Sequence, residues 1–387
     1  MANEQDRLRV SALEFDSIKN SFKEYLKGQD TFKDYDFEGS AMSILLDVLA
    51  YNTHYHAFYN NMTASEMFLD SASIRSSAVS IAKQLGYTPR SKTSSYAKIK
   101  VTISDSTSQD ANKSIPAYTK FTTNLDGTGY SFYNLNNLIA KPSAFDADGN
   151  ITHYESEEFL IYEGKVKTQS FTNDAIISEQ RFLIENTDMD TSTMKVHVKA
   201  SIDTPDEDKV LWSKITNITE LSSLSESYGV EESVDGFFEL RFGDGVIGKK
   251  LEDGNVIEVT YLQTNGQLLN GAGKTFTTPI GTVTVIDSAI GGGDREDIDS
   301  IKFTAPKAFA TQERAVTTED YKALVLRDFP NVETVEAWGG QDNDPPAFGK
   351  VFLSIKPKQG FSLATAEKLA IIKSLTSNRN VVGVTPE

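Results

Sequence analysis

The sequence predicts an α+β protein with an N-terminal helical arm or bundle, a β-rich antiparallel middle region and a small C-terminal α+β domain. Three observations predict this fold class. Up to about residue 92, apolar residues recur at three- and four-residue spacing; from about residue 94 the period changes to two; after a triglycine at 291–293, helical and strand patterns mix. A chain of 387 residues is long enough for two or three domains. We place them at 1–92, 93–290 and 291–387.

The composition is typical of a soluble globular protein, with 39% hydrophobic and 24% charged residues. Cysteine is absent, which excludes disulfides and thiolate metal sites and suits a reducing cytoplasm. The net charge of −17 disfavours nucleic acid and anionic lipid as partners, because that affinity rests on clustered lysine and arginine. The apolar run at 41–50 is too short to cross a bilayer, and residues 1–30 contain no signal-peptide core. We therefore expect no membrane insertion.

Three amphipathic segments predict the helices of the arm. The first carries an apolar stripe and ends at Gly28, which is placed as a C-cap. The third ends at the stop signal formed by Gly86 and Pro89. The stripe of the first segment consists of Phe15, Ile18, Phe22 and Leu26.

The second segment, which starts after Ser40 as its N-cap, is apolar and aromatic over a broader arc than a three-helix layer needs. Two interpretations stay open: a buried central helix, and a coiled contact between subunits. Its apolar positions are Ile44, Leu45, Val48, Tyr51 and Tyr55, followed by Phe58 or Tyr59.

The middle region reads as short antiparallel strands. Apolar and polar residues alternate over 97–103, which predicts a half-buried strand. Turn signals of the Asp-Gly type then recur, as between the strands of hairpins. We expect polar loops at 105–112, 202–208 and 221–235. Further strands are predicted at Phe159–Tyr162, Phe182–Glu185, Met194–Val198, Phe237–Phe242 and Val256–Leu262.

Gly291, Gly292 and Gly293 predict a flexible hinge before the C-terminal domain. Beyond it, Thr317 to Asp320 resemble a capping box that opens a helix, which Pro330 closes. The remaining pattern predicts a small α+β layer and then, at 381–384, an approach to another strand, so we expect a longer natural chain. The elements of this layer are strands Val332–Trp338 and Val351–Ile355 and a helix Ala364–Leu375.

The histidines and glycine-rich segments do not predict a metal or nucleotide site. None of His54, His56, His153 and His197 has zinc-ligand spacing. The segment 271–275 has leucine where a phosphate loop needs glycine, and no helix follows it.

The acidic clusters favour turns over cation sites. Asp146, Asp148 and Asn150 surround Gly149 in the order of a β-turn, without the glycine position or flanking helices of an EF-hand. The acidic run at 294–299 is more typical of a solvated hinge. No serine elbow or cysteine nucleophile occurs, whereas a carboxylate pair for glycoside cleavage stays open, because sequence does not show separation. We predict no catalytic residue, cofactor or metal.

The most informative stretch is a strand that runs into a glycine turn between residues 239 and 248. Glycine permits positive φ there, and an aspartate can hydrogen-bond its own turn. We expect valine at Gly243 or Gly245 to disrupt folding or incorporation. The motif consists of Phe242, Gly243, Asp244 and Gly245 and, after the triglycine, Arg314, Thr317, Asp320 and Tyr321. In this order it resembles the baseplate J-like family of contractile tails and related injection machines.

The N-terminal block narrows the resemblance. The segments DYDFEGS at 34–40, LAYNT at 49–53 and GYTP at 86–89 are similar to those of the baseplate wedge proteins of T-even-like phages. The segments YEG at 162–164 and ENT at 185–187 are similar too. Their collinear order covers the chain from about residue 20 to its end. The family often has glycine where Tyr118 stands, which affects the local turn there.

The resemblance implies a non-catalytic structural subunit in the tail baseplate of the virion, assembled in the host cytoplasm. Its implied partners are a second copy within a wedge, copies in adjacent wedges, other baseplate wedge proteins, and the tail hub and sheath-initiating proteins. The helical arms of two copies join a third wedge protein, and contacts between adjacent wedges close a ring. Dilation of this ring releases sheath contraction. We expect the arm to be buried only on assembly, through Phe15, Ile18, Phe22, Leu26, Ile44, Leu45, Val48, Tyr51 and Tyr55.

Two other functions are alternatives to this one. A glycan- or receptor-binding tail protein usually presents aromatic platforms, whereas Trp212 and Trp338 are far apart in sequence. A tail-associated hydrolase would depend on acidic residues. A glycan array and activity on cell-wall polymer discriminate these functions from the structural one.

Overall fold

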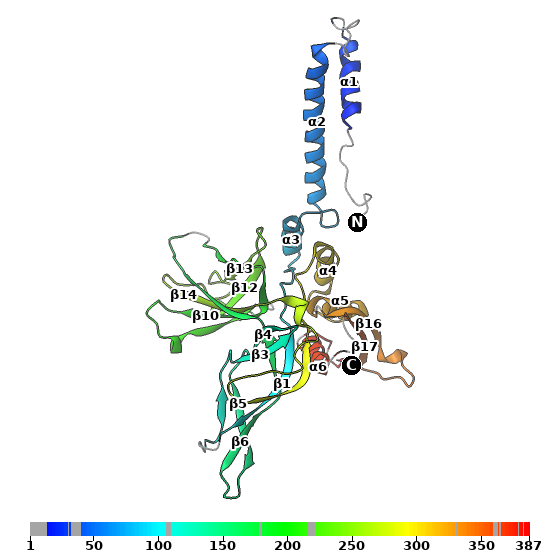
Figure 1. The fold of residues 1–387 in the computed structure, drawn as a ribbon. Helices are drawn as coiled ribbons and strands as arrows, with labels where there is room; N and C mark the ends of the chain where they lie inside the picture. The colour runs from blue at the N-terminus through cyan, green and yellow to red at the C-terminus, as the bar shows by residue number, and fades with distance from the viewer. Residues whose placement is uncertain are drawn as a thin grey trace. The chain divides into compact units, whose positions relative to one another are not determined.

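The computed structural model describes residues 14–29, 31, 40–105, 110–177, 180–215, 221–329, 331–358, 363, 365–377, 379–381 and 383–387. The chain forms two units, Met1–Gln84 and Leu85–Glu387 (Figure 1). The first is helical, and the second holds antiparallel sheets followed by a small α+β region. The predicted fold class is therefore confirmed, while the boundaries proposed at 92/93 and 290/291 stay predictions.

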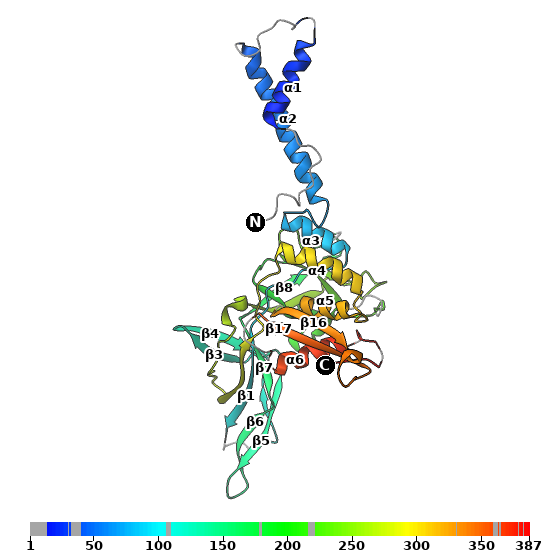
Figure 2. The same ribbon diagram turned by 90° about the vertical axis from the view of Figure 1, so that its right-hand side faces the viewer.

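In the described residues of the first unit there are three helices, of which the first two pack side by side (Figures 1 and 2). Ile18 and Leu46 are buried in this hairpin, and Lys19 forms a salt bridge of 2.5 Å with Asp47. The first helix ends at Gly28, as the sequence predicts. The helices are α1 (Phe15–Lys27), α2 (Ala41–Glu66) and α3 (Arg75–Gln84).

An eight-stranded antiparallel sheet begins the second unit. The strand order is β2-β5-β6-β1-β7-β4-β3, and β15 pairs with β1 from far along the sequence. Ile99, Phe121 and Phe132 are fully buried in its core. The strands are β1 (Tyr96–Ser104), β2 (Lys113–Ile115), β3 (Lys120–Leu125), β4 (Thr128–Tyr133), β5 (Leu138–Phe145), β6 (Ile151–Ser156), β7 (Phe159–Glu163) and β15 (Thr282–Ile290).

A seven-stranded sheet forms the second layer, in the order β8-β14-β10-β11-β12-β13-β9. The β11–β12 pair is parallel, and the core includes Val196, Trp212 and Ile257. The strands are β8 (Lys165–Thr172), β9 (Phe182–Ile184), β10 (Met189–Lys199), β11 (Val210–Lys214), β12 (Ser227–Glu232), β13 (Phe238–Phe242) and β14 (Val256–Gln263).

The predicted loop at 221–235 is wrong, because it contains β12. Tyr228, Val230 and Glu232 alternate as its buried positions. Glu232 hides the strand pattern because a carboxylate rarely lies inside. Its burial is compensated by a salt bridge of 2.6 Å with Arg295. The predicted loop at 202–208 contains only a short 3-10 turn at Asp206–Asp208, and part of 105–112 lies outside the described residues.

The C-terminal region is a three-stranded sheet with helices against it. Leu324, Val335 and Ile371 lie in its core, and the strand order is β16-β17-β18. The last strand pairs in parallel with β17. The elements are α4 (Ile298–Thr311), α5 (Thr318–Asp328), α6 (Thr365–Thr376), β16 (Val332–Gly339), β17 (Lys350–Pro357) and β18 (Thr385–Pro386), with 3-10 turns at Gly266–Leu269 and Gly340–Asp342 elsewhere in the unit.

The acidic run before α4 is solvated only in part, because Asp294, Asp297 and Asp299 are exposed but Glu296 is not. Glu296 is buried, and the Asp297 carboxylate caps α4 by accepting from Ser300 N at 2.7 Å. The helix itself was not predicted, and it contains Pro306.

The triglycine is buried and hydrogen bonded. Gly293 exchanges backbone hydrogen bonds of 2.9 and 3.1 Å with Thr93. Gly292 exchanges two bonds of 2.8 Å with the side-chain amide of Asn270. A Cβ at Gly291 would lie 2.3 Å from the Tyr96 ring, and one at Gly292 would lie 2.2 Å from Ser95 Oγ. These glycines therefore allow a close backbone approach, and the contacts argue against a loosely flexible joint at this point.

Candidate assembly surface

The two sides of α2 differ in what covers them. Leu46, Ala50 and Ala57 are buried and recur at spacings of four and seven, so they lie on one side of the helix. The opposite side is apolar and exposed. We call it the arm stripe, and it consists of Ile44, Val48, Tyr51, Tyr55, Phe58, Tyr59 and Met62, with exposed fractions from 38% to 68%.

The tyrosines of the arm stripe are ordered by contacts with one another. The Tyr51 and Tyr55 rings meet edge to face at 4.6 Å, and their hydroxyls are 2.8 Å apart. The Tyr55 and Tyr59 rings stack at 6.2 Å. This spacing of four places them in line along one face. An exposed ladder of aromatic rings with little side-chain entropy left to lose is suited to packing against another protein.

Charge is sparse on this helix. Its 26 residues contain Asp47, which is paired with Lys19, and Glu66 near the end. Glu66 accepts from Ser73 N at 2.8 Å and closes the turn toward α3. No helix in the described ranges is both long and apolar enough to span a membrane. The surface is therefore apolar, continuous and not paired with charges.

The structure divides the predicted interface residues into two groups. Ile18 is buried and Phe15, Phe22 and Leu26 are half-buried, all on α1. Five positions on α2 are exposed, namely Ile44, Leu45, Val48, Tyr51 and Tyr55. In the isolated chain α2 is thus not the buried central helix that the sequence left as one option. The prediction that Ile18 contacts a partner is wrong, because its side chain is buried within the hairpin.

Sequence reasoning missed several exposed apolar residues in the arm stripe or close to it. Leu49 and Met62 lie on α2, and Met67 and Phe68 follow its end. The sequence shows that these residues are apolar. It does not show that they are exposed, because a methionine or leucine in an apolar helix is as typical of a buried position.

The glycine motif forms a closed turn after β13. The Asp244 carboxylate accepts from Val246 N and Ile247 N at 2.8 and 2.9 Å. These N–H groups, Ile247 first, hold the pKa of Asp244 below its usual range. Gly245 N donates to Gly248 O at 3.1 Å. Phe242 anchors the turn, with its ring 5.4 Å from those of Phe182 and Trp212.

The second half of the motif forms the start of α5. Thr317 Oγ1 accepts from Asp320 N at 3.3 Å, and Asp320 Oδ2 accepts from Thr317 N at 2.8 Å, which completes the capping box. Tyr321 is buried, and burial raises its pKa. Arg314 is exposed just before this cap. These residues act locally in α5, whereas the glycine turn belongs to the seven-stranded sheet.

The described residues gather no metal site from three or more histidine, aspartate or glutamate side chains. Asp146 instead closes a β-turn by accepting from Asp148 N and Asn150 N at 2.9 and 2.8 Å. Gly271 lies in a turn with a φ of +83°, and its N–H donates to Ala289 O. Both segments are structural turns in the folded chain.

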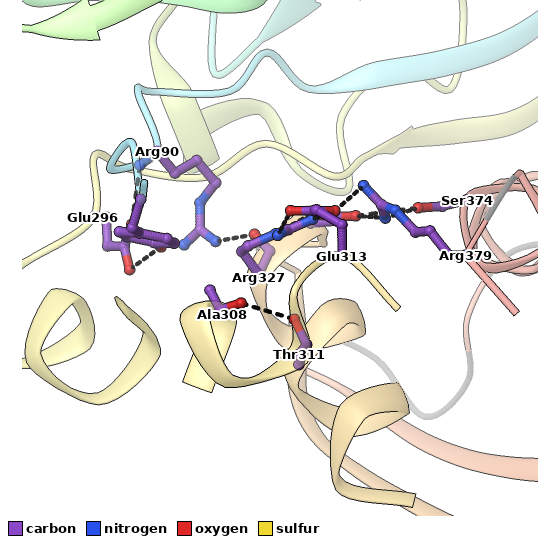
Figure 3. Close-up of polar contacts among 10 residues, drawn as sticks. Arg90, Glu296, Ala308, Thr311, Glu313, Arg327, Ser374 and Arg379 are labelled. Carbon is purple, nitrogen blue, oxygen red and sulfur yellow. Dashed lines mark hydrogen bonds and ion pairs between the residues drawn. The ribbon is translucent and has the colours of Figure 1, made fainter. Parts of the chain in front are cut away.

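A polar network ties α5 to its surroundings (Figure 3). Arg327 donates to both carboxylate oxygens of Glu313 and to Asp328. Arg379 donates to Asp328 and Glu313 from the C-terminal segment. Arg90 Nη1 donates to the Arg327 carbonyl at 3.1 Å. The network therefore joins the start of the second unit, α5 and the chain after α6.

Two family profiles match the chain at its two ends. The helical domain of gp6-like baseplate wedge proteins matches residues 14–87, and the C-terminal domain I of the baseplate structural protein gp6 matches residues 317–387. The baseplate wedge protein gp6 of Enterobacteria phage T4 is 29% identical over 404 residues. The chain is similar to the gp6-like baseplate wedge proteins.

This confirms the resemblance found in the sequence. The alignment covers 96% of this chain and 58% of the T4 protein, so the chain spans little more than half of that relative. The N-terminal match contains the whole arm stripe, and the C-terminal match begins at the Thr317 cap.

Two solved baseplate structures were also aligned with the chain by backbone structure. The anti-feeding prophage baseplate matches with a TM-score of 0.31 and 12% identity, over 98% of this chain and 79% of that one. The TssK-TssF-TssG baseplate subcomplex of a type VI secretion system matches with a TM-score of 0.33 and 8% identity, over 88% and 95%. Scores this low do not establish a shared fold.

Proposed function

We propose that this gp6-like chain is a structural, non-enzymatic subunit of a tail baseplate wedge in the virion. It assembles in the host cytoplasm with a second copy and with other wedge proteins through the arm stripe. Further contacts between adjacent wedges close a ring around the tail hub and reach the sheath-initiating proteins. The ring transmits the conformational change that triggers sheath contraction.

The observation that carries this proposal is the exposed apolar face of α2. Burial of each large side chain in a partner stabilises a complex by about 1.5–3 kcal/mol. The seven residues of the arm stripe therefore supply on the order of 10 kcal/mol before the losses of association. This gain favours association through the arm stripe, whereas the same face in water is an unsatisfied apolar patch.

The second unit supports the transmitting role. Its α5 is held by the network of Arg327, Glu313, Asp328 and Arg379, and its triglycine is clamped by Asn270. A body cross-linked in this way moves as one piece when a neighbour is displaced. The hinge proposed at the triglycine is less favoured by these contacts than rigid transmission.

The experiment that tests the proposal is the mass of the chain in solution, alone and with wedge partners. Val48→Glu and Tyr55→Glu place a charge within the arm stripe, and Asn60→Glu places the same charge on α2 away from it. We expect the wild type and Asn60→Glu to form a dimer or a stable complex, and the two stripe variants to remain monomers with unchanged helix content.

Hydrogen exchange supplies a second readout. The amides of α1 and α2 should exchange faster than those of the β sheets in the isolated chain and become protected in the complex. An isolated arm as protected as the sheets, or a wild-type monomer that binds no wedge partner, would contradict the proposal.

A further inference from the structure

The connection between α4 and α5 has an unusual backbone. Gln312 and Glu313 have φ values of 46° and 59°, both in the left-handed region. A helix often ends with one left-handed residue, which is usually glycine and sometimes asparagine. Two such residues in succession are rare when both carry a Cβ. This connection is therefore strained, and the surrounding structure must maintain it.

The amino acids of the connection favour a different conformation. Gln312, Glu313, Arg314 and Ala315 are all good helix formers, and neither glycine nor proline occurs between α4 and α5. Gln312 and Arg314 are exposed, so burial of their side chains does not hold the backbone in place. The local preference is for α4 to continue, and the folded connection opposes it.

The carboxylate of Glu313 holds the connection in its strained form (Figure 3). Arg327, in the last turn of α5, donates to both oxygens of this carboxylate, with Nη2 at 3.0 Å from Oε2. Arg379, which follows α6, is paired with the same Oε2 at 3.1 Å. We call these contacts the Glu313 clamp. A guanidinium that donates twice to one carboxylate fixes its direction as well as its position.

The Glu313 clamp can open without leaving its arginines unpaired. Arg327 Nε donates to Asp328 Oδ1 at 2.7 Å, and Arg379 Nη1 donates to Asp328 Oδ2. Breaking an ion pair is most costly when a buried charge loses its counter-ion, and Asp328 remains for both arginines. The side chain of Glu313 is 51% exposed, so water can hydrate its carboxylate once it leaves. The clamp is therefore suited to reversible opening.

The freedom to rearrange lies in residues 312–314. Ala315 N donates to Arg379 O at 2.7 Å, and Ala315 forms a parallel bridge with Asn380. These bonds tie Ala315 to the C-terminal segment and not to α4. If residues 312–314 adopted helical angles, α4 would lengthen by about 4.5 Å. The elements beyond them would then shift relative to α4.

We propose that residues 312–314 are a strained latch that the Glu313 clamp keeps closed. Opening of the clamp lets α4 lengthen and displaces α5, α6 and the three-stranded sheet relative to α4. While the latch is closed the second unit moves as one piece, and opening is a separate step. Its trigger, the displacement of a neighbouring wedge protein, rests on the proposed function, whereas the latch itself is a property of the isolated chain.

The test is the distance between two nitroxide labels, measured by double electron–electron resonance. The chain contains no cysteine, so Asp299→Cys on α4 and Lys373→Cys on α6 supply two exposed and specific labelling positions. Glu313→Gln in this background should produce a second distance, with a population at least about ten times that in the labelled parent. Adding Gln312→Gly should suppress the second distance, because glycine adopts the left-handed region without strain and disfavours the longer helix.

Glu333→Gln is the matched control, since it removes an exposed carboxylate that is paired with Lys356 at 2.7 Å on the three-stranded sheet. It should leave the distance distribution of the labelled parent unchanged. A distribution in Glu313→Gln equal to that of the parent would overturn the proposal. A second distance that persists with Gln312→Gly would also overturn it, because the region would then be loosened and not lengthened.

A second measurement holds even if Glu313→Gln does not fold. Gln312→Gly alone should raise the melting temperature of the second unit by about 1–3 °C, because it relieves the strain. Lys368→Gly, at an exposed position within α6, should lower it. A lower melting temperature for Gln312→Gly would overturn the latch. Both measurements use the isolated chain, so they are independent of whether the arm stripe binds a wedge partner.

Discussion

The Tyr87 hydroxyl lies 2.9 and 2.7 Å from the two carboxylate oxygens of Glu296, which is 209 positions away in sequence. Glu296 also accepts from Arg90 N at 2.9 Å, and its own N–H donates to Arg90 O at 3.1 Å. Its side chain is buried. These bonds satisfy a buried charge and fix residues 87–90 to the start of α4.

Tyr87→Phe should lower the free energy of unfolding of the second unit by about 1.5–3 kcal/mol, because it leaves a buried carboxylate short of one donor. Urea unfolding followed by tryptophan fluorescence measures the change. Tyr130→Phe removes a hydroxyl without a hydrogen bond in the described chain and should change the midpoint little. Equal effects of the two variants would show that Glu296 is satisfied without Tyr87.

The bond between Tyr87 and Glu296 also shows which parts of the fold could be predicted. The capping box of Thr317 and Asp320 is local, three residues apart, and the sequence predicts it correctly. α4 was not predicted, and Glu296 before it is buried against Tyr87 and Arg90, which lie 209 and 206 positions away. Local pattern contains no information about such a partner, and the acidic run therefore looked solvated.

The assembly surface was likewise predictable only in part. Helical spacing marks Ile18 and Val48 alike as apolar, but it does not show which side of a helix its own neighbour covers. Packing of α1 against α2 buries the first and leaves the second exposed. The positive φ of Tyr118 was indicated only by the glycine that the resembling family often has there, and the bond that holds this turn, from Tyr118 N to Asn134 O, comes from a later strand connection.

Gly243→Ala and Gly245→Ala should differ in severity. A Cβ at Gly243 would lie 2.3 Å from the carbonyl carbon of Gly248, so the turn backbone must move. At Gly245 the nearest atom is 3.7 Å away, and only its φ of +93° opposes alanine. We expect Gly245→Ala to lose about 1–2 kcal/mol and Gly243→Ala to lose more than about 4 kcal/mol. Chemical unfolding of both variants measures this, and equal losses would contradict the backbone clash.

Asp328→Asn should remove part of the acid sensitivity of the fold. Burial alone would raise the pKa of Asp328, but the guanidinium groups of Arg327 and Arg379 outweigh it and hold the pKa below its usual range. A lowered pKa gives stability that is present above the unfolded value of about 4 and is lost as pH falls through the folded value.

At pH 7 the asparagine variant should therefore be less stable than the wild type by about 2–3 kcal/mol, and the difference should shrink in acid. Urea unfolding across the acid range measures it, with the exposed Asp342→Asn as the control. A difference that is constant with pH would mean that packing, and not charge, carries the contribution of Asp328.

Glu367→Gln should make the C-terminal region more stable in alkali. Burial raises the pKa of Glu367, while a hydrogen bond from Asn331 Nδ2 opposes the shift. A raised pKa gives stability that is complete below the unfolded value of about 4.3 and is lost as pH rises through the folded value. Glutamine has nearly the same shape and stays neutral, so the variant avoids this loss. Its melting temperature should match that of the wild type near pH 4 and exceed it by a few degrees at pH 8, as differential scanning calorimetry would measure. The exposed Glu333→Gln is the control and should show no such crossover. A variant less stable than the wild type at pH 8 would show that the carboxylate is ionised and needed for the bond to Asn331.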